Sequence, residues 1–145
     1  MTTGMTTAAD IVAVARAQIG TRWVHQGRLP GVALDCVGLV VHVGRATGLV
    51  APDFDVNGYS RAPDGDMLNQ AGLHLVRIDG PELGAVIVLA TEVEPQHVGI
   101  VADYRHGGWS IVHASNAGVA RVVETRLMFT RAMALRGYFR FPGIV

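Results

Sequence analysis

Apolar residues recur with a helical period in the first third of the chain, where two segments carry helix-start signals. In residues 7–19, TAADIVAVARAQI, apolar positions fall three or four apart, Thr7 is placed to cap the first turn, and Asp10 lies inside that turn. Residues 36–47, CVGLVVHVGRAT, are mostly apolar, and Asp35 directly precedes them. Because aspartate is a preferred N-cap, this segment also predicts a helix rather than a strand.

The pattern changes after the middle of the chain, where short β-rich runs follow one another between Gly, Pro, Asp and Asn residues. Residues 21–34 and 51–66 hold Gly and Pro and predict loops. Strands are expected at 74–78, 85–90, 98–103, 109–114, 119–124 and 135–141, and short helices at 66–72 and 125–132. Helices followed by strands are typical of an α+β fold with an antiparallel sheet.

Composition excludes several classes of protein. The length of 145 residues predicts a single domain, 1–145, and the 50% of apolar residues predict a compact fold. Basic and acidic residues both number 12, so no basic excess is available to bind nucleic acid. The single cysteine excludes an intrachain disulfide.

Two further absences in the sequence bear on location. No apolar run reaches the roughly 18 residues of a membrane span. The first ten residues, MTTGMTTAAD, have neither a basic region nor a long apolar core, which predicts no secretory signal and synthesis in the cytoplasm.

Three residues are candidates for chemistry. Cys36 begins the second predicted helix, where the positive end of the helix dipole favours a thiolate. His97 opens the apolar run VGIVA, and His113 lies in WSIVHAS near the end of the next predicted strand. If 98–103 and 109–114 form a hairpin, the two histidines are neighbours, provided that strand alternation places both rings on one face.

One cysteine and two histidines allow two chemistries besides a plain structural role. The first is a thiolate nucleophile with a base and an orienting partner, and the second is a zinc site of Cys-His-His type. Zinc motifs usually hold two ligands close together in sequence, whereas each candidate here lies on a separate element, which favours the nucleophile. His25, in the loop before Cys36, is placed to line a cleft or to lie on the surface.

At these residues the sequence resembles the NlpC-type cysteine peptidases, which are papain-like cell-wall hydrolases. Their D-C-x-G-[LFV] nucleophile segment is DCVGL at 35–39, their H-V-G-I segment is HVGI at 97–100, and their [IV]-H-A segment is VHA at 112–114. Their G-T-x-[Tyr] segment is GTRW at 20–23. The likeness extends from about Ala9 to Pro142.

The resemblance implies a papain-like α+β fold, with Cys36 as nucleophile, His97 as general base and acid, and His113 as the residue that orients His97. Trp23 stands where the family often has a tyrosine whose hydroxyl helps the oxyanion hole, and it offers an indole N–H instead. Asp35 is interpreted as an N-cap rather than a catalytic group. No metal and no organic cofactor is implied.

Finer features are similar to the branch of the family encoded in phage and gene-transfer-agent tail clusters: WVHQ at 23–26, VVE at 122–124 and FRFP at 139–142. They imply a peptidase that opens peptidoglycan stem peptides during DNA delivery, carried by a phage-like tail and acting in the periplasm. Two alternatives remain open. One is a structural tail-tip component with an idle peptidase site, and the other is a papain-like amidase or acyltransferase with another substrate.

Overall fold

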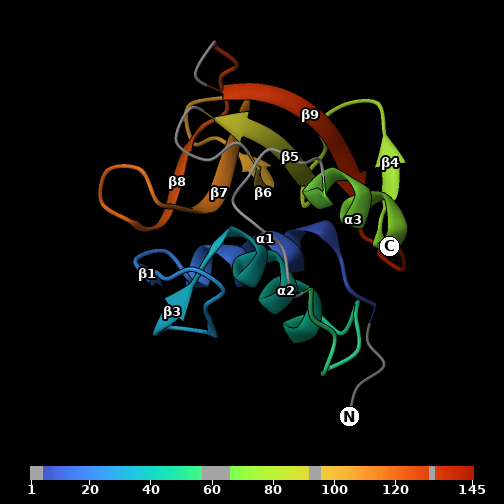
Figure 1. Cartoon of the computed structure of the whole chain (residues 1–145). Helices are drawn as coiled ribbons and strands as arrows, with labels where there is room; N and C mark the ends of the chain where they lie inside the picture. The colour runs from blue at the N-terminus through green and yellow to red at the C-terminus, as the bar shows by residue number, and fades with distance from the viewer. Residues whose placement is uncertain (1–4, 57–65, 92–95, 131–132) are drawn as a thin grey trace.

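The computed structural model describes residues 5–56, 66–91, 96–130 and 133–145 (Figure 1). Its helices are α1 (Ala8–Ala17), α2 (Cys36–Ala46) and α3 (Asp66–His74). Its strands are β1 (Arg22–Trp23), β2 (Arg28–Leu29), β3 (Ala33–Leu34), β4 (Val76–Ile78), β5 (Val86–Thr91), β6 (His97–Asp103), β7 (Trp109–Ser115), β8 (Arg121–Arg126) and β9 (Met133–Arg140).

The strands form one sheet in the order β2-β3-β1-β8-β7-β6-β5-β9-β4. Strands β1 and β3 run parallel, and every other neighbouring pair in the described chain is antiparallel. Helices α1 and α2 pack together against this curled sheet, and α3 lies beside β4 and β9 (Figure 1). The predicted α+β fold with a mainly antiparallel sheet is therefore confirmed.

The central strands are buried on both faces of the sheet. Val86, Val88 and Ile100 pack with the apolar sides of α1 and α2, whereas Ile87 and Leu89 belong to a second cluster on the opposite face. A strand that is covered on both sides has apolar residues at successive positions. This explains why apolar and polar residues do not alternate in VIVLA and VGIVA. Strands β6 and β7, which carry His97 and His113, are likewise buried along most of their length.

Helix α1 is held at both ends by polar contacts. Thr7 caps its first turn, as the sequence predicts, and the Asp10 side chain accepts the Thr7 backbone N–H in return, which completes a capping box. Near its end, Arg16 donates to both carboxylate oxygens of Glu124 on β8, at 2.9 Å each. The hydrogen bond from Arg16 holds the pKa of the Glu124 carboxyl below its usual range. This ion pair joins α1 to the sheet.

Three sequence expectations are wrong. The short helix expected at 125–132 does not form in the described part of that range: β8 continues to Arg126, and 127–129 have no regular structure. The loop expected at 21–34 contains three two-residue strands. His74 ends α3 instead of starting a strand. In the first two cases, the pairing of β8 with β7 and of β1 with Arg121 overrides the local preference.

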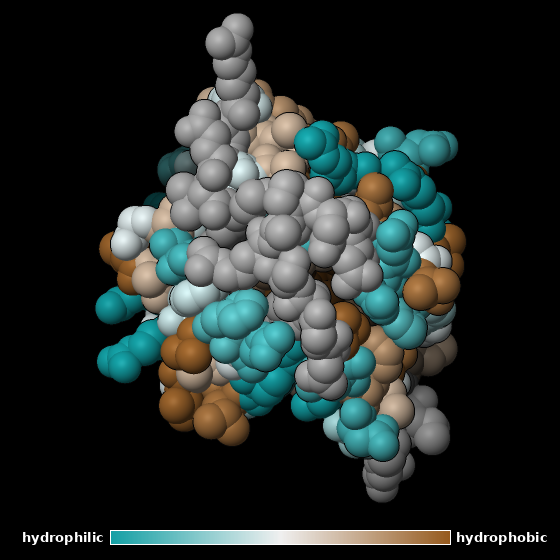
Figure 2. All heavy atoms as spheres, viewed as in Figure 1, coloured by the Kyte–Doolittle hydropathy of each residue, from teal (hydrophilic) through white to brown (hydrophobic). Residues whose placement is uncertain are grey.

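Apolar side chains on the face shown in Figure 2 gather in small groups separated by polar ones. One group lies over the β1–β3 segment, where Val24, Leu29 and Val32 are exposed. Among the described residues, no helix has the length and apolar character needed to cross a membrane.

Candidate active site

Helix α2 begins at Cys36 because Asp35 caps it. The Asp35 carboxylate accepts the backbone N–H of Gly38 at 2.7 Å, and its backbone carbonyl accepts that of Leu39 at 3.0 Å. Asp35 is 2% exposed and Cys36 is 8% exposed. The cap places the thiol in the first turn, at the positive end of the helix dipole, as the sequence predicts.

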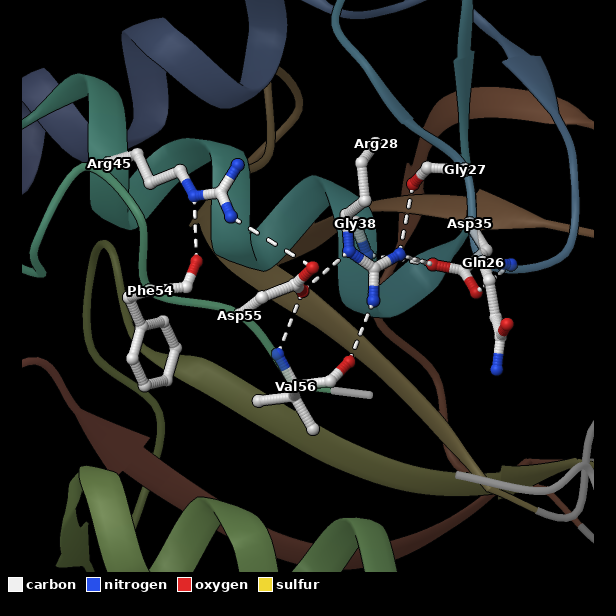
Figure 3. Close-up of polar contacts among 9 residues, drawn as sticks. All are labelled: Gln26, Gly27, Arg28, Asp35, Gly38, Arg45, Phe54, Asp55 and Val56. Atoms are coloured by element: carbon white, nitrogen blue, oxygen red, sulfur yellow. Dashed lines mark hydrogen bonds and ion pairs between the residues drawn. The ribbon is translucent and has the colours of Figure 1, made fainter. Parts of the chain in front are cut away.

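A buried ionic network fixes this helix start to two loops (Figure 3). The Arg28 guanidinium donates to Asp35 at 3.0 Å, to Asp55 at 2.8 Å and to the carbonyl of Val56 at 2.9 Å. The other Asp35 oxygen accepts the N–H of Gln26 at 2.8 Å. Burial raises the pKa of Asp55, but the hydrogen bonds from Arg28 and Val56 outweigh it, and the net shift is downward. Sequence inspection missed Arg28, because nothing local marks its partners.

Glycine at position 38 is required by the close approach of another backbone. A Cβ there would overlap the carbonyl oxygen of Gly27 and would lie 3.2 Å from the Asp35 carboxylate. Gly27 in turn accepts a 3.0 Å hydrogen bond from Arg28. The structure therefore explains the glycine of the DCVGL segment: without a side chain at this position, residues 26–28 pack directly on the first turn of α2.

Gly38→Ala is expected to destabilise the protein by about 1–3 kcal/mol, because the added methyl overpacks a backbone contact. Thermal unfolding would measure the change. Gly72→Ala in α3 is the matched control, since a Cβ there meets open space. The control should be neutral or stabilising by up to about 1 kcal/mol, because alanine is the better helix former. Equal melting temperatures for the two variants would contradict the packing argument.

The structure brings His97 and His113 into direct contact. His97 Nε2 lies 2.7 Å from His113 Nδ1, with ring centroids 4.9 Å apart and ring planes at 69°. Both rings are buried, at 1% and 6% exposure. Strands β6 and β7 form the expected hairpin, with Ile100 opposite Val112. The prediction that the two histidines are neighbours on one face is confirmed.

Gly99 makes room for this contact. It lies between His97 and Val101 on β6, and a Cβ there would be 2.7 Å from Ile111 and 3.0 Å from His113 Cβ. The bare backbone lets His113 lean across β6 toward His97. The glycine of the HVGI segment thus serves the pairing of the two rings.

Gly99→Ala should displace Ile111 and His113, and any activity that depends on the contact between His97 and His113 should fall by about tenfold or more, because misplaced reacting groups lose rate steeply. The measurement is kcat/KM on a cleavable peptide, together with the melting temperature. Gly80→Ala, where a Cβ meets nothing within 4 Å, is the control. A Gly99→Ala variant that loses stability but keeps full kcat/KM would show that the space serves packing alone.

Helix α2 places Cys36 beside the strands that carry the histidine pair. The helix packs on both β6 and β7, and Cys36 shares a core cluster with Val98, the residue after His97. The thiol, like the two rings, is buried.

The other predicted cleft residues lie on the segment before Cys36. Trp23, in β1, is half-buried and stacks with His25, which is exposed, at a ring-centroid distance of 6.4 Å. The Trp23 backbone N–H donates a hydrogen bond to the carbonyl oxygen of Ala120, which holds β1 beside the loop before β8. Asp35 is fully engaged as cap and ion-pair partner, which matches its interpretation as an N-cap.

An apolar pocket lies beside α2. Its wall includes Val37 and Val98, which adjoin Cys36 and His97 in sequence, and it continues past Met67 to Phe141. In the part of the chain that is described, no cluster of three or more His, Cys, Asp or Glu residues has the geometry of a metal site. The described residues that line the pocket include neither Cys36 nor either histidine of the pair.

Comparison with known proteins gives matches only at the level of structure. No protein-family model and no curated protein sequence matches the chain. The NlpC/p60 domain of the peptidoglycan hydrolase SagA superposes with a TM-score of 0.61 at 20% identity, over 93% of this chain and 99% of that one. An NlpC/p60 family protein from Bacillus cereus superposes with a TM-score of 0.65 at 17% identity, over 95% of this chain and 41% of that one.

NlpC1 from Trichomonas vaginalis gives a TM-score of 0.64 at 17% identity, over 97% of this chain and 46% of that one. The chain thus spans less than half the length of the Bacillus and Trichomonas proteins, but nearly the whole SagA domain. At these identities the likeness establishes architecture: the chain has the papain-like α+β fold of NlpC/p60 domains.

Proposed function

We propose that this chain is a cysteine peptidase that hydrolyses an amide bond in the stem peptides of bacterial peptidoglycan. Cys36 is the nucleophile, His97 the general base and acid, and His113 the residue that orients His97. The observation that carries the proposal is the 2.7 Å contact between His97 and His113, on the strands against which the Cys36 helix packs. The choice of substrate is supported by the fold shared with the peptidoglycan hydrolase SagA.

The geometry of the pair suits a proton carrier. His97 Nε2 is engaged with His113, so Nδ1 is the ring nitrogen that exchanges a proton with the thiol and the leaving group. Burial of both rings keeps water from competing for their hydrogen bonds.

The reaction proceeds through a thioester. The thiol proton passes to His97, the Cys36 thiolate adds to the scissile carbonyl carbon, and the C–N bond breaks as His97 returns that proton to the leaving amine. Water then adds to the thioester carbonyl while His97 takes its proton. The C–S bond breaks, the carboxylic acid leaves, and the thiol is restored. Overall, one amide and one water give one acid and one amine.

Charge on the carbonyl oxygen needs donors near Cys36. The cap uses the N–H groups of Gly38 and Leu39. The N–H of Cys36, one turn earlier at the helix start, is the donor proposed for the oxyanion.

Incubation with defined stem peptides, followed by mass spectrometry, tests the proposal. Wild-type protein should yield two fragments from a single amide bond, and Cys36→Ala protein under the same conditions should yield none. Fragments produced equally by both proteins would refute the thiol mechanism. Intact peptide with both proteins, together with slow labelling of Cys36 by iodoacetamide at neutral pH, would favour a structural component with an idle site.

The apolar pocket beside α2 supports one alternative. Its lining, which includes Val37 and Val98 but neither Cys36 nor His97, suits an acyl chain or an aliphatic side chain more than a charged peptide group. An amidase or acyltransferase acting on another substrate is therefore the second candidate. Thioester formation from acyl donors, detected as a mass increase on Cys36 without stem-peptide cleavage, would select it.

Incorporation into a phage-like tail, with action in the periplasm, is part of the proposal and rests on the sequence features alone. Several of these features have packing roles: Glu124 binds Arg16, and Phe139 and Phe141 are buried. Mass spectrometry of purified particles from the source bacterium tests the assignment. Detection of the chain in particles supports it, and its recovery only outside them opposes it.

A further inference from the structure

We propose that Thr125 is a positioning residue for this site, whose hydroxyl holds the His113 ring in the orientation and protonation pattern that His97 needs. The inference rests on the proposed function and extends the series of contacts by one residue, from β7 to β8.

The contact follows from the pairing of the two strands. Val123 lies opposite His113, and Thr125 lies opposite Ile111, so Thr125 is diagonal to His113 on the same face of the sheet. Its Oγ1 lies 3.2 Å from His113 Nε2, while His113 Nδ1 lies 2.7 Å from His97. Both nitrogens of the His113 ring are thus in contact: Nδ1 with the buried His97, and Nε2 with the exposed Thr125.

The positions of the protons determine what Thr125 does. When His97 has taken the thiol proton, both of its nitrogens carry hydrogen, so Nε2 donates to His113. His113 Nδ1 must then carry a lone pair, and neutral His113 has its proton on Nε2. That proton points at Thr125 Oγ1, which accepts it. The opposite tautomer would direct a proton at His97 Nε2 and oppose formation of the imidazolium.

The outward contact also prevents rotation of the ring. A half-turn of the His113 ring would replace Nδ1 by a carbon atom at His97, and both polar contacts would be lost. Valine at position 125 has no hydroxyl to accept the Nε2 proton, so the 3.2 Å contact is lost. Threonine and valine have nearly the same shape and the same preference for strands, so the substitution isolates the hydroxyl.

The test compares wild type, Thr125→Val and Thr125→Ser. Histidine ¹⁵N NMR reports which His113 nitrogen carries the proton, iodoacetamide labelling reports thiolate formation at Cys36, and peptide cleavage reports kcat and KM. We expect the wild type to carry the His113 proton on Nε2. Thr125→Val should lower the labelling rate and kcat by about three- to tenfold, the range of one neutral hydrogen bond, with KM unchanged. Thr125→Ser should have the labelling rate and the kcat of the wild type.

Two outcomes would overturn the inference: a wild-type His113 protonated on Nδ1, or a Thr125→Val variant with the NMR signals and labelling rate of the wild type. Both measurements need no substrate. If no variant cleaves stem peptides, the proposed function fails, yet the NMR and labelling data still decide the role of Thr125. If cleavage occurs and Thr125→Val behaves as the wild type does, the function stands and Thr125 is only a strand residue.

Discussion

Cys36→Ala is expected to reduce hydrolysis by about 10⁴-fold or more, because the variant has no nucleophile to form the thioester. The fold should remain intact. Alanine is a good helix former, Asp35 still caps α2, and a free cysteine packs much like a small apolar residue. We expect the free energy of unfolding to change by about 1 kcal/mol, the cost of removing one buried apolar group.

The experiment has a built-in specificity control. Cys36 is the single cysteine in the chain, so iodoacetamide labelling of the wild type reports on this thiol alone. Labelling and inactivation should follow the same time course, and substrate should slow both. Hydrolysis that persists at the wild-type rate in Cys36→Ala, with circular dichroism unchanged, would end the cysteine-peptidase interpretation.

Substitutions at His97 and His113 are expected to have unequal effects. His97 must accept and return a proton, and no neutral amide can do so; His97→Asn should therefore lose about 10²–10⁴-fold in kcat/KM. In the proposed mechanism, His113 accepts a hydrogen bond from the His97 ring, through the 2.7 Å contact between them, and holds the angle of that ring. An amide oxygen can accept the same bond, so His113→Asn or His113→Gln should retain measurable activity, and His113→Ala should lose more.

The four variants should be compared on one stem peptide, with folding checked by circular dichroism, because both rings are buried. The order expected for kcat/KM is wild type, then the His113 amide variants, then His113→Ala, then His97→Asn. If His97→Asn proved milder than His113→Asn, the base and its orienting partner would be reversed.

Local signals in the sequence determined the starts of the helices and the main hairpin. The start signal of α1 lies within four consecutive residues, so Thr7 and Asp10 identify this helix without any tertiary contact, and Asp35 identifies α2 as its N-cap. The turn between β6 and β7 is short and contains Gly107 and Gly108, both with positive φ. Such local pairing allowed the contact between His97 and His113 to be predicted.

Tertiary structure decided the elements that have no local signal. Strand β1 exists because it pairs with β3 and with Arg121, which is about a hundred residues away, and β2 exists because it pairs with β3. The extension of β8 to Arg126, where a helix was expected, follows from its register with Ser110 on β7. Strand preference depends on what each residue packs against, so such segments could not be predicted from their own composition.

The site divides in the same way. The sequence by itself determined which thiol and which imidazoles are candidates, since residue type and position along a strand are local properties. Only the tertiary structure showed why Gly38 and Gly99 bear no side chain, how Arg28 fixes the start of α2, and that Thr125 contacts His113. The residues in these contacts lie 7 to 14 positions apart in the sequence, and several of them lie on neighbouring strands. Which of them touch depends on the register of those strands, and no single segment determines that register.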